Sequence, residues 1–131
     1  MANTPQAPSQ LSRRERQIMD ILFRRARATA AEILNDMPDA PSYSAVRAHL
    51  RTLEQKGHVR HRAEEMRYVY LPVVRPEKAM RGAVRHLVET FFGGSPARAV
   101  AALIDSHSAE LSPDDLNRLS LRIEEAKKEG R

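Results

Sequence analysis

The chain has 131 residues, no cysteine and a net charge of +5. The lack of cysteine excludes disulfides, thiolate nucleophiles and cysteine-ligated metal sites, and no apolar run approaches the ~18 residues of a membrane span. The N-terminal ten residues have neither the basic start nor the apolar centre of a secretory signal peptide, so we expect a cytoplasmic protein with no membrane partner.

The positive charge is confined to one part of the chain. Residues 1–75 contain 13 Lys and Arg against 8 Asp and Glu, whereas residues 76–131 contain 9 of each kind. A basic segment joined to a neutral one is typical of a nucleic-acid-binding module attached to a second module. A net charge of +5 is modest, however, and many basic proteins bind no nucleic acid, so charge alone does not decide the function.

A tail, residues 1–10, precedes the predicted elements. It is rich in Pro, Ala and Gln, and we expect it to be disordered. A first helix is predicted from Ser12 to about Arg25, because Ser12 and Glu15 have the spacing of a capping box. Its apolar residues recur at helical spacing, which predicts one buried stripe.

A second, short helix is predicted to begin at Thr29, which forms another capping box with Glu32. The two prolines within residues 37–41 end this helix, because proline is not tolerated in a helix interior. Ser42 or Ser44 then caps a third helix.

The third predicted helix, residues 42–57, has two unlike faces. Val46, Leu50 and Leu53 fall within one narrow arc, and Gly57 supplies a stop. The opposite arc carries small residues and two arginines, where a helix that merely faces water would more often carry long Lys and Glu. Such a surface suits close approach to a polyanion, and a helix of this kind can lie in a DNA major groove. The residues of this outer arc are Ser44, Arg47, Ala48, Arg51 and Gln55.

Two short β-prone runs, residues 58–62 and 67–71, follow the third helix and are separated by residues 63–66. We expect them to form a β-hairpin, although no Asn-Gly or Asp-Gly marks its turn. Pro72 and Pro76 close the unit. Three helices followed by a hairpin are typical of a winged helix-turn-helix, so the predicted fold class is mainly α, with this unit followed by a helical one.

The remainder of the chain predicts three amphipathic helices, which begin near residue 77, at Ser95-Pro96 and at Ser112-Pro113. Three short helices in about 55 residues enclose little core by themselves, so their apolar stripes need a partner. We expect that partner to be the same segment of a second copy, which gives a two-fold dimer. The alternative is that these helices fold back on the first half as one monomeric domain. The predicted dimerisation residues are Met80, Val84, Leu87, Val88, Phe91, Val100, Leu103, Ile104, Leu116, Leu119 and Ile123.

Residues throughout the chain match one known family. They are Ser44-Ala45-Val46, Leu50-Arg-Thr-Leu53, Lys56-Gly57, Arg67-Tyr-Val-Tyr70 with Pro72, Phe92-Gly93-Gly94-Ser95, and Leu111-Ser112 before an acidic amphipathic helix. With these residues the chain resembles the penicillinase-repressor family, also called the BlaI/MecI/CopY type, over nearly all of residues 11–126. The resemblance implies a homodimeric repressor whose winged helix binds a palindromic operator on double-stranded DNA and whose C-terminal helices hold the dimer together.

Three departures limit what the resemblance implies. Family members usually have Thr-Thr-Val where this chain has Ser44-Ala45-Val46, which leaves the operator sequence open. The copper-responsive members carry a C-terminal cysteine cluster, whose absence here excludes thiolate copper sensing. The β-lactam-responsive members are cut by a sensor protease at an Asn-Phe bond. This chain has Ala102-Leu103 near that position and no Asn-Phe pair, so a sensor protease as partner and the inducing signal stay open.

The candidate DNA contacts lie mainly on the outer face of the third helix. Ser44 is placed to donate to a phosphate or a base edge, and Ala48 could approach a thymine methyl. Arg47 and Arg51 are one turn apart and could reach guanine or flanking phosphates. The alternative is that both arginines are merely solvated. The helix residues of the predicted site are Ser42, Tyr43, Ser44, Arg47, Ala48 and Arg51.

The wing supplies the other predicted contacts. Arg62 and Arg67 flank its tip and could bind phosphate. The two glutamates between them would repel phosphate, so we expect the tip itself to stay clear of the DNA backbone. Of Tyr68 and Tyr70, one is expected to pack within the hairpin rather than to stack on bases.

No other constellation in the sequence predicts chemistry. The five histidines lack metal-ligand spacing, and no catalytic arrangement or phosphate-binding glycine loop stands out, so we expect no enzyme, no metal and no cofactor. Two alternatives to a repressor remain: a winged-helix module that binds another protein instead of DNA, and a regulator gated by a metal or ligand at His86 or His107. The predicted organisation is a tail (1–10), a winged-helix DNA-binding domain (11–75) and a helical dimerisation domain (76–131).

Overall fold

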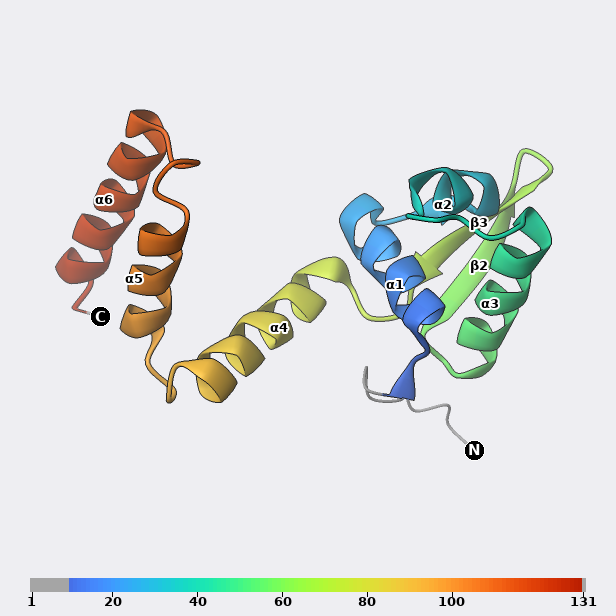
Figure 1. Ribbon diagram of the computed structural model, residues 1–131, viewed down its shortest axis with the longest axis horizontal. Helices are drawn as coiled ribbons and strands as arrows, with labels where there is room; N and C mark the ends of the chain where they lie inside the picture. The colour runs from blue at the N-terminus through green and yellow to red at the C-terminus, as the bar shows by residue number, and fades with distance from the viewer. Residues whose placement is uncertain (1–9, 131) are drawn as a thin grey trace. The chain divides into compact units, whose positions relative to one another are not determined.

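The computed structural model describes residues 10–130, so the predicted tail lies almost wholly outside the described residues. Two compact units make up the chain, one ending at Ala83 and the other starting at Val84, and helix α4 contributes to both (Figure 1). The elements in chain order are α1 (Arg13–Arg25), β1 (Ala28–Thr29), α2 (Ala30–Asp36), α3 (Tyr43–Gln55), β2 (Val59–Glu64), β3 (Arg67–Pro72), α4 (Pro76–Phe91), α5 (Pro96–Ser106) and α6 (Pro113–Lys128).

Helix α1 begins where the capping-box spacing predicts. The Ser12 hydroxyl accepts a hydrogen bond from the Glu15 amide (3.1 Å), and the Glu15 carboxylate accepts one from the Ser12 amide (2.8 Å). These two bonds satisfy amides that the first turn of a helix otherwise leaves unpaired. Ile18 and Leu22 are fully buried in the core, so the predicted helix start and buried stripe are confirmed.

The second capping box, of Thr29 and Glu32, is also present and starts α2. A two-residue strand, β1, comes directly before it, and the sequence pattern does not predict this strand. Ala28 pairs with Tyr70 and Thr29 with Val69, so β1 joins the hairpin in an antiparallel sheet of order β1-β3-β2. The sheet therefore ties the start of α2 to the hairpin.

Helix α3 packs its apolar face into the core of the first unit, in contact with α1 and α2. Its N-cap is Ser42, whose hydroxyl accepts a hydrogen bond from the Ala45 amide (3.1 Å). The residues that the pattern assigns to the inner arc are 0% exposed, which confirms the predicted division of the helix into two faces; they are Val46, Leu50 and Leu53.

The C-terminal end of α3 is a Schellman turn. Gly57 has a φ of +87°, a conformation that glycine adopts without strain. The His58 amide donates to the Leu53 carbonyl (3.0 Å), and the Gly57 amide donates to the Glu54 carbonyl (3.1 Å). The predicted glycine stop is confirmed, and the chain passes directly from it into β2.

Strands β2 and β3 form the predicted hairpin, but its turn is shorter than expected. Glu64 pairs with Arg67, which leaves a two-residue turn of Glu65 and Met66 instead of a four-residue connection. Both turn residues have positive φ, +48° and +65°, as a type I′ turn requires. The three helices and this hairpin make the first unit a winged helix, in agreement with the predicted fold class.

The second unit leaves most of its apolar side chains exposed. Helices α5 and α6 begin at Ser95 and Ser112, as predicted, with each serine hydroxyl accepting an amide hydrogen bond. Ala99 of α5 is buried, whereas α4 and α6 contain no buried residue. None of the helices formed within residues 10–130 combines the length and the apolar character that a membrane crossing needs.

Candidate nucleic-acid interface

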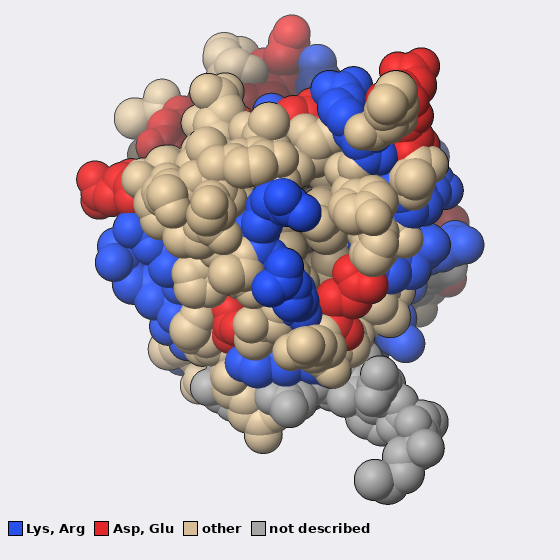
Figure 2. All heavy atoms as spheres, turned by 90° about the vertical axis from the view of Figure 1, so that its right-hand side faces the viewer, with Lys and Arg blue, Asp and Glu red and all other residues tan. Residues whose placement is uncertain are grey.

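The outer face of α3 is open along its length. All six helix residues of the predicted site are exposed, and the Tyr43 ring retains 48% of its accessible surface. Because Val46, Leu50 and Leu53 hold the opposite face in the core, the rotation of the helix about its axis is fixed. Figure 2 views the side on which α3 and the hairpin lie, and it shows basic side chains in the middle of that face with acidic groups beside them.

Between α3 and the hairpin lies a surface depression, which we call the helix–wing groove. Its first part has a volume of about 230 Å³, and its second part, toward α2 and the hairpin tip, has a volume of about 280 Å³. Arg47, Tyr68 and Tyr70 line both parts, which makes them neighbouring sections of one groove. The other principal lining residues are Arg51, Glu54 and His61 in the first part, and Tyr43, Met66 and Arg67 in the second.

A side-chain hydrogen bond connects the two walls of this groove, and ring contacts order the wing wall. His61 Nδ1 on β2 lies 2.6 Å from Glu54 Oε1 on α3. The His61 ring also lies against Tyr68, with centroids 4.6 Å apart, and against Tyr70, at 5.7 Å. The wing is therefore held to α3 by side chains as well as by the short chain connection.

The two hairpin tyrosines have different environments. Tyr70 is 8% exposed and belongs to the core, and burial raises the pKa of its phenol. Tyr68 is 51% exposed. The expectation that one of the two packs within the hairpin is confirmed for Tyr70, and Tyr68 is left with an accessible ring beside α3.

The strand register places the two wing arginines of the predicted site on the hairpin face opposite His61, although Arg67, at the tip, also lines the second part of the groove. Successive residues of a strand alternate between faces, and the register pairs Arg62 with Val69 and Glu64 with Arg67. His61, by contrast, pairs with Tyr70 on the face toward α3. Arg62 Nε donates to Glu64 Oε2 (2.7 Å), although the Arg62 side chain remains 49% exposed.

Glu64 has a second basic partner, Arg27, in the connection between α1 and β1. The hydrogen bond from Arg27, supported by Arg62, lowers the pKa of the Glu64 carboxyl. One of the two acidic charges expected to repel phosphate is thus compensated within the protein. Sequence reasoning missed this pairing because Arg27 and Glu64 are far apart along the chain.

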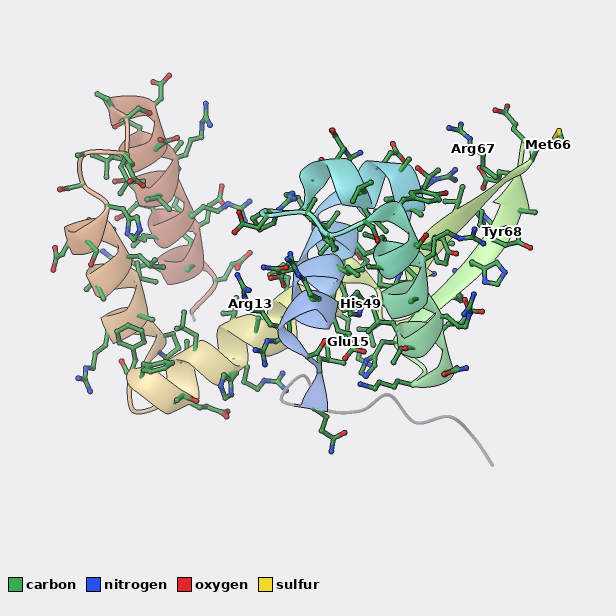
Figure 3. All side chains as sticks on the ribbon, turned by 45° about the vertical axis from the view of Figure 1, so that its right-hand side comes forward. Arg13, Glu15, His49, Met66, Arg67 and Tyr68 are labelled. Atoms are coloured by element: carbon green, nitrogen blue, oxygen red, sulfur yellow. The ribbon has the colours of Figure 1, made fainter. Side chains whose placement is uncertain are left out.

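The tip of the β2–β3 hairpin extends past the helices of the first unit (Figure 3). Met66 lies at its end with a fully exposed side chain, and Arg67 points back toward α2. Tyr68 lies further along β3. Sequence reasoning left Tyr68, His61 and Glu54 out of the site. The alternation of strand residues carried the signal that His61 and Tyr68 share a face, but their contact with Glu54 depends on how the hairpin packs on α3.

Two comparisons with known proteins found a similarity. The family model of the penicillinase repressors matches residues 11–125. The chain is also similar to the DNA-binding domain of the repressor BlaI, whose structure was solved in solution. The two share 22% sequence identity, the likeness covers 54% of this chain and 88% of that one, and the TM-score is 0.47. No curated protein sequence shows a significant match.

Proposed function

Because the chain belongs to the penicillinase repressor family and is therefore a DNA-binding transcriptional repressor, we propose that it acts as a homodimer on an operator with two-fold symmetry. Each copy places α3 in one major groove, and the two grooves lie on the same side of the duplex about 34 Å apart. A dimer bound in this way occludes the promoter.

The observation that carries this proposal is the outer face of α3. It is exposed from end to end, it carries Arg47 and Arg51 between small side chains, and it is backed by three fully buried apolar residues. The inner residues fix the helix, so the outer ones need no rearrangement to meet base edges. The proposed DNA contacts are Ser42, Tyr43, Ser44, Arg47, Ala48 and Arg51 on α3 with Arg62 and Arg67 on the wing.

The proposed dimer rests on the apolar stripes of α4, α5 and α6. In the single chain nine of the eleven predicted dimerisation residues are exposed, and Val88 and Ile104 are half-buried. Phe91 retains 69% of its accessible surface and Leu103 retains 53%. Large apolar side chains gathered at this density on a surface mark an interaction site. We take a second copy of the chain as the partner, because its identical stripes can bury these side chains in a two-fold symmetric interface.

Selection of bound sequences from a random double-stranded DNA library tests the proposal. We expect the full chain to enrich inverted repeats, with half-sites separated by about one helical turn or a multiple of it. Arg51→Ala should lower affinity for the enriched site by about 1–3 kcal/mol and relax the preference at one position of each half-site. Enrichment of single, unrepeated sites, or no enrichment at all, would contradict the proposed function.

A further inference from the structure

The helix–wing groove runs alongside the helix that we propose to enter the major groove. A helix in that groove is flanked on both sides by the sugar-phosphate walls of the duplex, because the major groove is only about 12 Å wide. A depression beside the helix therefore faces the DNA backbone rather than base edges. The chemistry of the occupant follows from this placement: it is a strand of phosphodiesters.

The wing wall of the groove offers a hydrogen-bond donor at the right place. Tyr68 is half-exposed and lines both parts of the groove from the wing, as Arg47 does from α3. A neutral phenol donates well to a phosphate oxygen, and hydroxyl side chains are regular contacts of DNA phosphates. We propose, on the basis of the proposed function, that Tyr68 donates a hydrogen bond to an operator phosphate held in the helix–wing groove, and that Arg47 binds the same strand from the α3 side.

His61 and Glu54 position this tyrosine. The His61 ring lies against the Tyr68 ring, and Glu54 on α3 fixes His61 through the 2.6 Å contact. The same contact occupies the Glu54 carboxylate, which is the acidic group in the first part of the groove. The groove thus presents the Arg47 guanidinium and the Tyr68 phenol to the DNA strand, while the Glu54 carboxylate is already paired with His61.

The proposal separates the roles of two arginines that sequence reasoning treats alike. Arg47 lines both parts of the groove, whereas Arg51 lines only the first and lies further round the helix toward its outer arc. Arg47 is accordingly the phosphate contact and Arg51 the base contact. Phosphate contacts add affinity without sequence preference, and base contacts add preference.

The test compares Tyr68→Phe with Tyr70→Phe, which removes the same atom from the neighbouring ring that is only 8% exposed. Binding of the full chain to a selected operator and to an unrelated duplex is measured by fluorescence anisotropy at several salt concentrations. Tyr68→Phe should weaken binding to both duplexes by about ten-fold, the value of one hydrogen bond to a charged acceptor. Its salt dependence should be unchanged, because a neutral phenol releases no counterion. Tyr70→Phe should bind within two-fold of the wild type.

Two further variants complete the design. Arg47→Ala should weaken both duplexes and reduce the salt slope by about one phosphate equivalent. His61→Ala should weaken binding in the wild-type background but not in the Tyr68→Phe background, since a positioning residue acts through the group it positions.

Unchanged affinity of Tyr68→Phe would overturn the proposal, and so would a loss confined to the operator or a reduced salt slope in that variant. A wild-type chain that binds no duplex would instead refute the proposed function. The two failures are therefore distinguishable.

Discussion

Glu15 brings a carboxylate into the edge of the core, where it is 4% exposed. Burial by itself raises the pKa of Glu15, but hydrogen bonds from the Ser12 amide and from the Lys56 ammonium (2.9 Å) outweigh burial, so its pKa is lowered overall. His58 lies near this pair. Burial, supported by the charge of Lys56, lowers the pKa of His58, and its buried Nε2 has no hydrogen-bond partner within the described chain.

Acid should therefore destabilise the fold in two stages. The folded-state pKa of His58 lies below its ordinary value of 6.5, so as pH falls the unfolded chain takes up a proton first and stability declines from about pH 6.5 downward. Glu15 acts in the same direction. Its pKa is lowered in the folded protein, so the stability that its carboxylate provides is lost as pH falls below the ordinary pKa of 4.5. We expect His58→Leu to remove the first stage and leave the second.

Guanidinium unfolding at a series of pH values from about 7.5 down to about 2.5 measures both stages, because the Glu15 stage begins only below pH 4.5. His86→Gln is the matched control, because His86 is exposed on α4 and its replacement should leave the first stage intact. An unaltered decline in the His58→Leu protein between pH 7 and 5.5 would show that another group is responsible.

The burial of some single residues can be predicted from the sequence, whereas the long-range contacts of others cannot. The burial of Val46, Leu50 and Leu53 follows from helical spacing alone, because a helix repeats its faces at a fixed interval. The pairing of Glu64 with Arg27 depends instead on where the hairpin packs. No local pattern encodes such a contact.

Helix ends are the element-scale features that local sequence determines best. The predicted Ser12 and Thr29 capping boxes both form, and so does a third at Ser112, which was predicted only as the start of its helix. The donor and acceptor of each box lie within one turn. Strand β1 escapes prediction because two residues are too few to show alternation, and its stability comes from pairing with β3. The hairpin turn was expected to be longer because it has neither glycine nor asparagine at its two positive-φ positions.

Two glycines should respond in opposite directions to the same substitution. Gly57→Ala places a Cβ at φ +87° and should lower the free energy of unfolding by about 1 kcal/mol or more. Gly82 lies inside α4, where an added Cβ meets no atom within 4 Å. Gly82→Ala should therefore raise the free energy of unfolding by roughly 0.5–1 kcal/mol.

Urea unfolding followed by circular dichroism would measure both changes. Gly82 lies on the side of α4 away from the Met80–Phe91 stripe, so its substitution leaves the proposed dimer surface untouched. A loss of stability in Gly82→Ala, or none in Gly57→Ala, would contradict the backbone argument.

At the scale of the whole molecule, the proposed dimer should depend on one face of the helices that follow the winged helix. Phe91→Glu puts a charge at the C-terminal end of the α4 stripe, on its most exposed apolar side chain. The protein should then sediment as a monomer at micromolar concentration, because burying an unpaired carboxylate is strongly unfavourable. Operator affinity should fall with it, since each copy alone binds one half-site.

The second unit provides a matched control. Leu121 is 64% exposed, but helical spacing places it on the side of α6 opposite Leu116, Leu119 and Ile123. Leu121→Glu should therefore leave the sedimentation coefficient of the dimer unchanged. Equal dissociation by both substitutions, or by neither, would refute the proposed surface.

Amphipathic spacing predicts which side chains of α4, α5 and α6 form apolar stripes, and that they need covering stays a prediction. It could not predict how two copies fit together, because that arrangement depends on the shape of a paired surface that no single chain contains. Sedimentation of the purified chain tests the proposed self-association directly.

The outer face of α3 has one more consequence, which concerns how the DNA sequence preference of such a regulator can change during evolution. Ser44, Ala48 and Arg51 are exposed, while the scaffold is held by residues on the opposite side of the helix. Surface substitutions away from structural contacts usually change folding free energy by less than about 0.5 kcal/mol. Under the proposed function, in which these three residues contact DNA, single substitutions among them would change the operator sequence that the protein binds while its fold stays intact.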